Sequence, residues 1–98
     1  MWIRLGSFAV VPGRVDELRA TYNLDCAPIV RAVAGNLDCY LMENADDGER
    51  CIVCTVWESE ADAVAYEASG TAQAIIARVR GFFAGPPTLA SYRVDRDR

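Results

Sequence analysis

The fold of this chain is decided by the stretch CIVCTVWESEADAVAYEASG, which runs from Cys51 to Gly70. Its first part, 51–57, is an apolar and β-branched run that predicts a strand. Ser59 and Asp62 then have the spacing of a helix capping box, with Asp in place of the preferred Glu or Gln. The strand therefore turns at once into a helix. Trp57, at the junction, either plugs the end of a core or forms the wall of a pocket.

The same kinds of signal, followed outward, predict the remaining elements. Pro28 lies inside the apolar stripe of the first helix, where it kinks the helix or ends one segment, with Asp25 as a cap for the next. A polar turn that contains Asp47 and Gly48 suits a hairpin. The predicted strands span 2–10, 37–43, 50–57 and 88–94, and the predicted helices span 15–33, 59–68 and 71–83.

The order of these elements is β-α-β-β-α-β, which predicts an α+β fold of the ferredoxin-like type. In this sandwich, helices cover one face of a four-stranded antiparallel sheet. Residues 1–98 are expected to form one domain, and 95–98 are expected to be a frayed tail.

The third strand is apolar on both of its faces. An antiparallel sheet with one wet face alternates apolar and polar residues, and the helices of one chain cover only one face. We therefore expect a homodimer whose sheets face each other, the alternative being a monomer with an exposed apolar face. The two sets of side chains are Cys51, Val53 and Trp57 on one face, and Ile52, Cys54 and Val56 on the other.

Composition limits the class of protein. The net charge of −4 argues against nucleic acid or an anionic membrane as the main partner. The start of the chain lacks a signal-peptide pattern, and no apolar run reaches the ~20 residues of a membrane helix, so we expect a cytoplasmic protein with reduced cysteines. Cys51 and Cys54 have CxxC spacing, but on a strand they point to opposite faces, which predicts buried thiols and no disulfide or metal site.

The absence of histidine from the sequence excludes an imidazole base, a histidine metal ligand and histidine-ligated haem. No glycine-rich phosphate loop is present. What remains is a set of large side chains, some with polar tips, that suit a flat aromatic ligand in a cavity between the helices and the sheet, although core packing alone explains each of them singly. The set is Trp57, Tyr22, Tyr66, Phe82, Phe83 and Met42.

Three segments resemble the antibiotic biosynthesis monooxygenase (ABM) family. VWESEADAVAYEASG, residues 56–70, is similar to the strand-to-helix signature of ABM domains; CAPIVRAVAGNLDCYLMEN, residues 26–44, is similar to the helix-to-strand passage; and VVPGRVDEL, residues 10–18, fits the entry to the first helix. The resemblance implies a dimeric α+β barrel. Members include cofactor-free oxygenases of aromatic polyketides and haem-degrading oxygenases.

The resemblance also implies roles for particular residues. Trp57 matches the tryptophan of both kinds of oxygenase. The asparagine and histidine of the haem degraders fall near Gly6 and Ile76, which disfavours haem degradation, and Val53 and Ala63 stand where polyketide oxygenases carry polar companions.

We therefore expect a cofactor-independent monooxygenase of a small electron-rich aromatic or quinol-like metabolite; the alternative is a non-catalytic dimeric protein that binds a small ligand. Trp57 would stack on or gate the substrate, and Tyr22 or Tyr66 would hydrogen-bond its oxygen. Arg78 would favour an anion if it points inward, and an exposed position on the helix surface is its alternative. The remaining substrate-binding candidates are Met42, Ile76, Phe82 and Phe83, and no cofactor or metal is expected.

Overall fold

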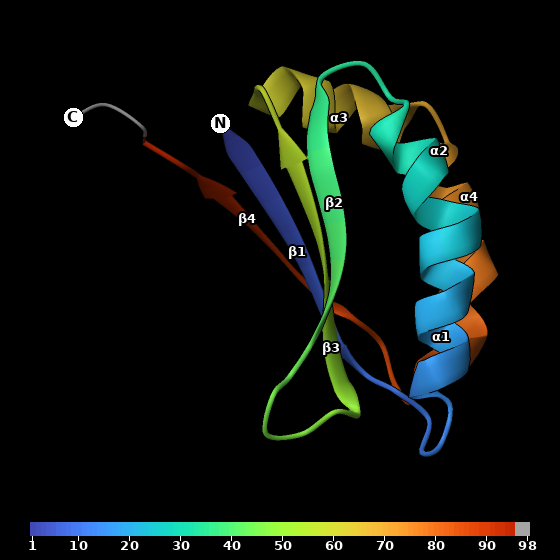
Figure 1. The fold of residues 1–98 in the computed structure, drawn as a ribbon. Helices are drawn as coiled ribbons and strands as arrows, with labels where there is room; N and C mark the ends of the chain where they lie inside the picture. The colour runs from blue at the N-terminus through green and yellow to red at the C-terminus, as the bar shows by residue number, and fades with distance from the viewer. Residues whose placement is uncertain (96–98) are drawn as a thin grey trace.

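A four-stranded antiparallel sheet with strand order β2-β3-β1-β4 forms the centre of the computed structural model, which describes residues 1–95 (Figure 1). This order is the one that the ferredoxin-like prediction requires. Each strand begins and ends within one residue of its predicted bounds, because turn residues and prolines flank the strands. The strands are β1 (Trp2–Ala9), β2 (Asn36–Glu43), β3 (Arg50–Trp57) and β4 (Thr88–Arg93).

All the helical segments lie on one face of this sheet (Figure 1). The segment between β1 and β2 holds three of them, and the segment between β3 and β4 holds the others. Gly70, in a left-handed conformation with φ +87°, separates the two α-helices of the second segment, as Ser69-Gly70 predicted. The segments are α1 (Val15–Thr21), a π-helical turn η1 (Tyr22–Cys26), α2 (Ala27–Arg31), α3 (Glu60–Ala68), α4 (Thr71–Val79) and a 3₁₀ turn η2 (Arg80–Phe82).

The π-helical turn is the structural effect of Pro28. Pro28 lies in the first turn of α2, and in a regular α-helix its ring would collide with the carbonyl of Leu24. The chain widens by one residue instead, so that the Ala27 N–H donates to the carbonyl of Tyr22. The prediction that Asp25 caps a new helix is wrong, because the chain stays helical through this turn and no side chain caps α2.

The junction after β3 is held in place by Gly35 and Ser59. Ser59 Oγ accepts a hydrogen bond from the Asp62 backbone N–H at 3.2 Å, which confirms the predicted cap of α3. Gly35 has φ +83° and lies against Asp62, and a Cβ added to Gly35 would lie 2.2 Å from Asp62 Cγ. The Gly35 carbonyl also accepts from the Glu58 N–H at 2.9 Å. These contacts fix Trp57 at the end of the sheet.

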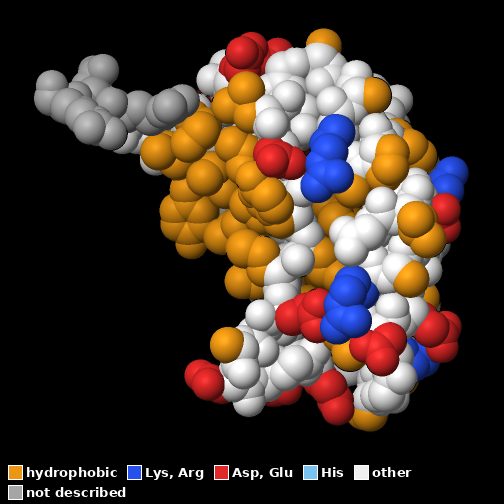
Figure 2. All heavy atoms as spheres, in the orientation of Figure 1, with side chains coloured by type: hydrophobic (Ala, Val, Ile, Leu, Met, Phe, Trp, Pro, Cys, Tyr) orange, Lys and Arg blue, Asp and Glu red, His pale blue; other side chains and the backbone are white. Residues whose placement is uncertain are grey.

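The other face of the sheet carries no helix, and Figure 2 shows hydrophobic side chains gathered on that side of the molecule. Strand register places Cys51 on the helix side and Cys54 on the open side, as predicted, and both are free thiols. Half-exposed Tyr40 and Tyr92 also lie on the open face. The apolar side chains of this open face are Ile3, Leu5, Tyr40, Met42, Ile52, Cys54, Val56, Ala90 and Tyr92.

Two further sequence predictions concern the C-terminal tail and the absence of a membrane-spanning helix. Of the predicted frayed tail, 95–98, only Asp95 belongs to the described residues, where it lies beyond the end of β4; 96–98 lie outside them. Within residues 1–95, none of the helices has the length and apolar character that crossing a membrane requires.

Candidate functional site

A cavity of about 220 Å³ lies between the helix layer and the inner face of the sheet. Its floor consists of alternate residues of β1, β3 and β4, and its walls come from η1, α3, α4 and the segment that leads into β4. The walls combine apolar surface with a few polar groups, which is the usual character of a small-molecule site. The lining residues are Arg4, Gly6, Phe8, Tyr22, Val53, Thr55, Tyr66, Glu67, Ala72, Gln73, Ile75, Ile76, Val79, Phe83, Pro87 and Leu89.

The side chain of Tyr22 lines this cavity, and its hydroxyl is buried. Its side chain is 1% exposed, and its oxygen has no hydrogen-bond partner among the described residues. Burial is the main reason that the pKa of Tyr22 is raised above its ordinary value, and the neighbouring Cys39 side chain raises this pKa further. The Cys39 thiol donates instead to the carbonyl of Ala27, at 3.7 Å. A buried hydroxyl without a partner costs free energy, and a ligand oxygen would remove that cost.

Trp57 stands behind the wall of the cavity. It is 0% exposed and does not line the cavity, but two of its neighbours do. The indole Nε1–H donates to Thr55 Oγ1 at 2.9 Å, and the indole ring lies 4.9 Å from the ring of Tyr66, centroid to centroid. Burial raises the pKa of Tyr66 to about 12, so its hydroxyl stays protonated at neutral pH. Trp57 therefore acts on the cavity through Thr55 and Tyr66.

Arg4 and Glu67 form an ion pair on the cavity wall. Arg4 Nε lies 2.7 Å from Glu67 Oε1, and Arg4 Nη1 donates to Ser91 Oγ at 3.3 Å. The two side chains are 31% and 34% exposed, so the pair stands where the cavity meets solvent. It joins β1 to α3 and brings a positive and a negative charge to an otherwise largely apolar wall.

The structure brings some of the sequence-predicted residues to the cavity and separates others from it. Tyr22, Tyr66, Ile76 and Phe83 line it, and the ring of Phe83 lies 4.2 Å from that of Phe8.

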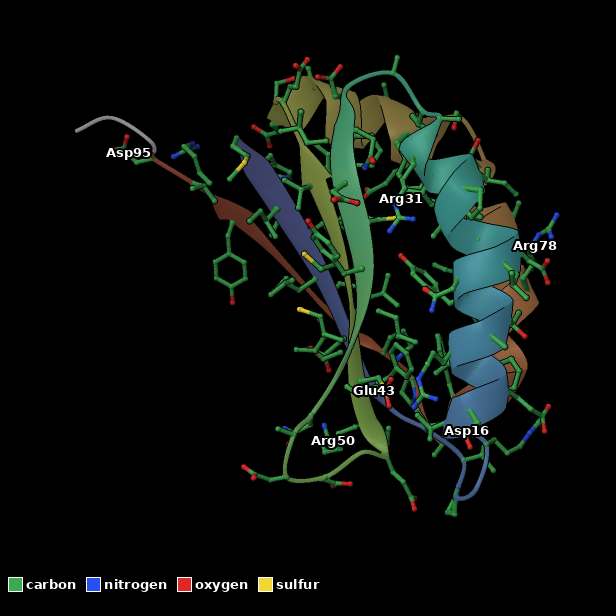
Figure 3. The ribbon with its side chains drawn as sticks, viewed as in Figure 1. Asp16, Arg31, Glu43, Arg50, Arg78 and Asp95 are labelled. Atoms are coloured by element: carbon green, nitrogen blue, oxygen red, sulfur yellow. The ribbon has the colours of Figure 1, made fainter. Side chains whose placement is uncertain are left out.

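Phe82 is buried in the core beside the cavity, with the Arg14 guanidinium 4.6 Å above its ring. Met42 is not on this side of the sheet, because its register partner is Ile52 of the open face. Arg78 is exposed, and Figure 3 shows it pointing from α4 away from the sheet. The placement of Met42 at this cavity is therefore corrected, and Arg78 has the exposed position that was its stated alternative.

Sequence reasoning missed Arg4, Thr55, Glu67 and Gln73. A signal for Arg4 existed, since it shares the even positions of its strand with Gly6 and Phe8, which face the helices. A charged side chain at an inward position of a strand costs free energy unless it is paired. Such a residue is therefore a candidate for a functional site.

A second, more open hollow of about 340 Å³ lies beside the first. The two share Ile76, Phe83 and Pro87 in their walls, so the second hollow continues the cavity toward the loop before β4. Within residues 1–95, no group of three or more Cys, Asp or Glu side chains is placed to hold a metal ion.

Comparison with known families gives one clear match. The family model described as "Antibiotic biosynthesis monooxygenase" matches residues 1–78, which is most of the chain. Comparison with curated proteins gives no match.

Solved structures share the fold along nearly the whole chain. A monooxygenase from the gene ActVA-Orf6 of Streptomyces coelicolor, in complex with the ligand nanaomycin D, has a TM-score of 0.82 and 19% identity, covering 99% of this chain and 89% of that chain. Rv0793 from Mycobacterium tuberculosis has a TM-score of 0.78 and 19% identity, covering 98% and 96%. A conserved protein from Methanosarcina mazei Go1 has a TM-score of 0.81 and 16% identity, covering 97% and 94%. Identities this low establish the fold only.

Proposed function

Since the chain belongs to the antibiotic biosynthesis monooxygenase family, we propose that it is a cofactor-independent monooxygenase of a small, electron-rich aromatic or quinol-like metabolite. The substrate binds in the cavity between the helices and the sheet and supplies the electrons for the reaction. The protein orients the substrate, favours its anion and keeps water away from it.

The reaction converts a C–H carbon para to a phenolic hydroxyl into a carbonyl. The deprotonated substrate passes one electron to dioxygen, and the two radicals combine at the para carbon to form a peroxide. The peroxide takes up a proton, and its O–O bond breaks as the para hydrogen leaves. One oxygen atom of dioxygen becomes the new carbonyl and the other leaves as water, so that 1-naphthol and dioxygen give 1,4-naphthoquinone and water.

The observation that carries this proposal is Tyr22, whose side chain lines the cavity and whose buried hydroxyl has no hydrogen-bond partner within residues 1–95. Both Tyr22 and Tyr66 are protonated at neutral pH, as any tyrosine with the ordinary pKa of about 10 is, and burial raises the pKa of each further. Each can therefore donate a hydrogen bond to a substrate oxygen and stabilise negative charge there. Trp57 does not touch the substrate in this proposal; it holds the Thr55 hydroxyl and the ring of Tyr66 in place.

The assembly that we propose is a homodimer in which two open faces pack against each other. The face is broad, apolar and lacks a helix cover within the described residues, and Tyr92 at its edge is 54% exposed. Burial of an apolar face against an identical one is the usual isologous arrangement of a twofold dimer. The cavity lies on the opposite side of the sheet, so the dimer leaves its entrance open.

The test is dioxygen uptake by the purified protein with 1-naphthol or anthrone, in the presence of a metal chelator. Labelled dioxygen should place one labelled atom in the quinone. Trp57→Phe keeps an aromatic ring but loses the hydrogen bond to Thr55, and we expect a decrease in kcat of about tenfold or more. A rate equal to that of buffer with both substrates would refute the oxygenase proposal for this substrate class.

A second function, the binding of a small ligand without catalysis, is favoured by one observation. The only carboxylate among the residues that line the cavity within 1–95 is that of Glu67, and it is held in the ion pair with Arg4, so the cavity offers no unpaired carboxylate to take the proton of the substrate. Substrate binding without dioxygen consumption would support this function.

A further inference from the structure

Among the described residues, Arg4 is the only positively charged residue that lines the cavity of about 220 Å³, and Arg80 lines only the neighbouring hollow. We propose that the Arg4 guanidinium is the anion site of this cavity, and that the ligand is a phenol or enol of one or two rings that binds as its oxyanion. This inference rests on the proposed function for its reaction, but it concerns binding and is tested without dioxygen.

The geometry of Arg4 leaves it ready to bind an anion. A guanidinium has five N–H donors in a rigid plane. Nη1 donates one of them to Ser91 Oγ, and Nε lies 2.7 Å from Glu67 Oε1 in the ion pair. Within residues 1–95, Nη2 has no hydrogen-bond partner, while the contacts with Glu67 of α3 and Ser91 of β4 hold the plane of the group. A fixed donor with free N–H groups binds an oxyanion with little loss of side-chain entropy.

The position of Arg4 determines the orientation of the ligand. Arg4 is partly exposed, whereas the Tyr22 hydroxyl is almost completely buried. A charged oxygen keeps part of its hydration at the rim beside Arg4, and burying it at the Tyr22 end would cost far more. A second, neutral oxygen or the apolar ring then occupies the deeper part of the cavity, near Tyr22 and Tyr66.

The size of the cavity limits the ligand. An apolar protein cavity of about 150 Å³ holds benzene. The volume of about 220 Å³ found here fits one or two rings, and any larger part of a ligand extends into the neighbouring hollow past Ile76 and Phe83.

Glu67 and Arg4 should have opposite effects on the binding of an anion. Its carboxylate holds Arg4 in place, but its negative charge also repels a bound oxyanion. Glu67→Gln keeps a hydrogen-bond acceptor for Arg4 and removes the repulsion, so it should tighten the binding of an anion. Arg4→Gln removes the attraction and should weaken the same binding. If the ion pair only supports the fold, the two variants should change binding in the same direction.

The experiment is a titration of the protein with 4-nitrophenol, whose phenolate has its own absorption band, without dioxygen and over a range of pH. The wild-type protein should bind the phenolate form and lower the pKa of the bound probe. Arg4→Gln should raise the dissociation constant of the phenolate about tenfold and abolish the pKa change, whereas Arg4→Lys should keep part of it. Glu67→Gln should lower the dissociation constant severalfold.

The matched control is the Arg14–Glu17 ion pair, which has an N–O distance of 2.9 Å and does not line the cavity. Arg14→Gln and Glu17→Gln should leave the titration unchanged, and circular dichroism should show that every variant is folded. The proposal is overturned if the wild-type protein does not bind 4-nitrophenol, or if the Arg4 and Glu67 variants change binding in the same direction. Phenolate binding through Arg4 without dioxygen uptake would sustain this inference and refute the oxygenase.

Discussion

The indole of Trp57 donates its N–H to the hydroxyl of Thr55, two residues earlier on the same face of β3, at 2.9 Å. This hydrogen bond links a completely buried residue to one that lines the cavity. A threonine hydroxyl that accepts from Trp57 is left with its own hydrogen free to donate. Trp57, the most conspicuous residue of the sequence, therefore orients the hydroxyl of Thr55, which the sequence analysis did not single out.

The first prediction concerns the hydroxyl of Tyr22. Tyr22→Phe removes a buried polar atom without a partner, so the free energy of unfolding should rise by about 1 kcal/mol instead of falling. The same change should weaken phenol binding about fivefold or more, because the ligand loses a hydrogen bond. Urea unfolding and ligand titration measure the two effects. A loss of stability in Tyr22→Phe would mean that the hydroxyl has a partner inside the protein.

The second prediction concerns stability at alkaline pH. Burial raises the pKa of Tyr66 to about 12 and also raises that of Tyr22, whereas an unfolded tyrosine has a pKa of about 10. The folded state therefore holds these protons more tightly than the unfolded state. The stability that this supplies is complete below about pH 10 and is lost as pH rises from there toward 12, by up to about 1.4 kcal/mol per pH unit for each tyrosine.

Urea unfolding at a series of pH values measures this decline. Tyr66→Phe removes one of the two titrating tyrosines and should make the decline shallower, although the buried thiols Cys26, Cys51 and Cys54, whose pKa values burial also raises, still contribute to it. A stability that stays constant between pH 10 and 11.5 would contradict the prediction.

The third prediction concerns Gly35. Gly35→Ala would force both a left-handed backbone and a Cβ 2.2 Å from Asp62 Cγ, and should lower the free energy of unfolding by about 3 kcal/mol. Gly13 has a similar φ of +80° but nothing within 4 Å of the added Cβ, so Gly13→Ala should cost only about 1–2 kcal/mol. Chemical denaturation compares the two variants, and equal losses would show that the contact with Asp62 relaxes freely.

The fourth prediction concerns the open face. Ile52→Glu places a charge on this apolar face, next to Met42, and should convert the proposed dimer into a monomer. Leu24→Glu changes a side chain that is 75% exposed on the helix side, and it should leave the molar mass of the assembly in solution unchanged. Light scattering coupled to size exclusion measures both. A wild-type protein that is monomeric at micromolar concentration would be evidence against the dimer.

Much of the fold was predictable because its signals are local. The Ser59 cap, the Asp47-Gly48 turn and the glycine at position 70 each determine their own few residues. The π-helical turn was not predictable in detail, since Pro28 indicates a disturbance of the helix but not whether the chain breaks or widens there.

The site was less predictable because it depends on pairs that are distant in the sequence. Arg4 on β1 and Glu67 on α3 reveal each other only in the fold. Met42 was misplaced because its size and flexibility suit a cavity, whereas the register of β2 turns Cys39 and Leu41 inward and Met42 outward. The direction of Arg78 stayed open in the sequence, because it adjoins Val79, which is buried on α4, and a single position turns a helical side chain by about 100°.

Substitutions in strand β1 fall into two kinds, those that face the cavity and those that face the open side of the sheet. Its even positions, such as Arg4 and Gly6, face the cavity, and its odd positions, such as Ile3 and Leu5, face the open side. The sheet is one residue thick, and neighbouring side chains of a strand do not touch. A substitution at an even position can therefore alter the ligand without altering whatever covers the open face, and the reverse holds at odd positions. Selectivity and assembly can thus diverge independently within a single strand.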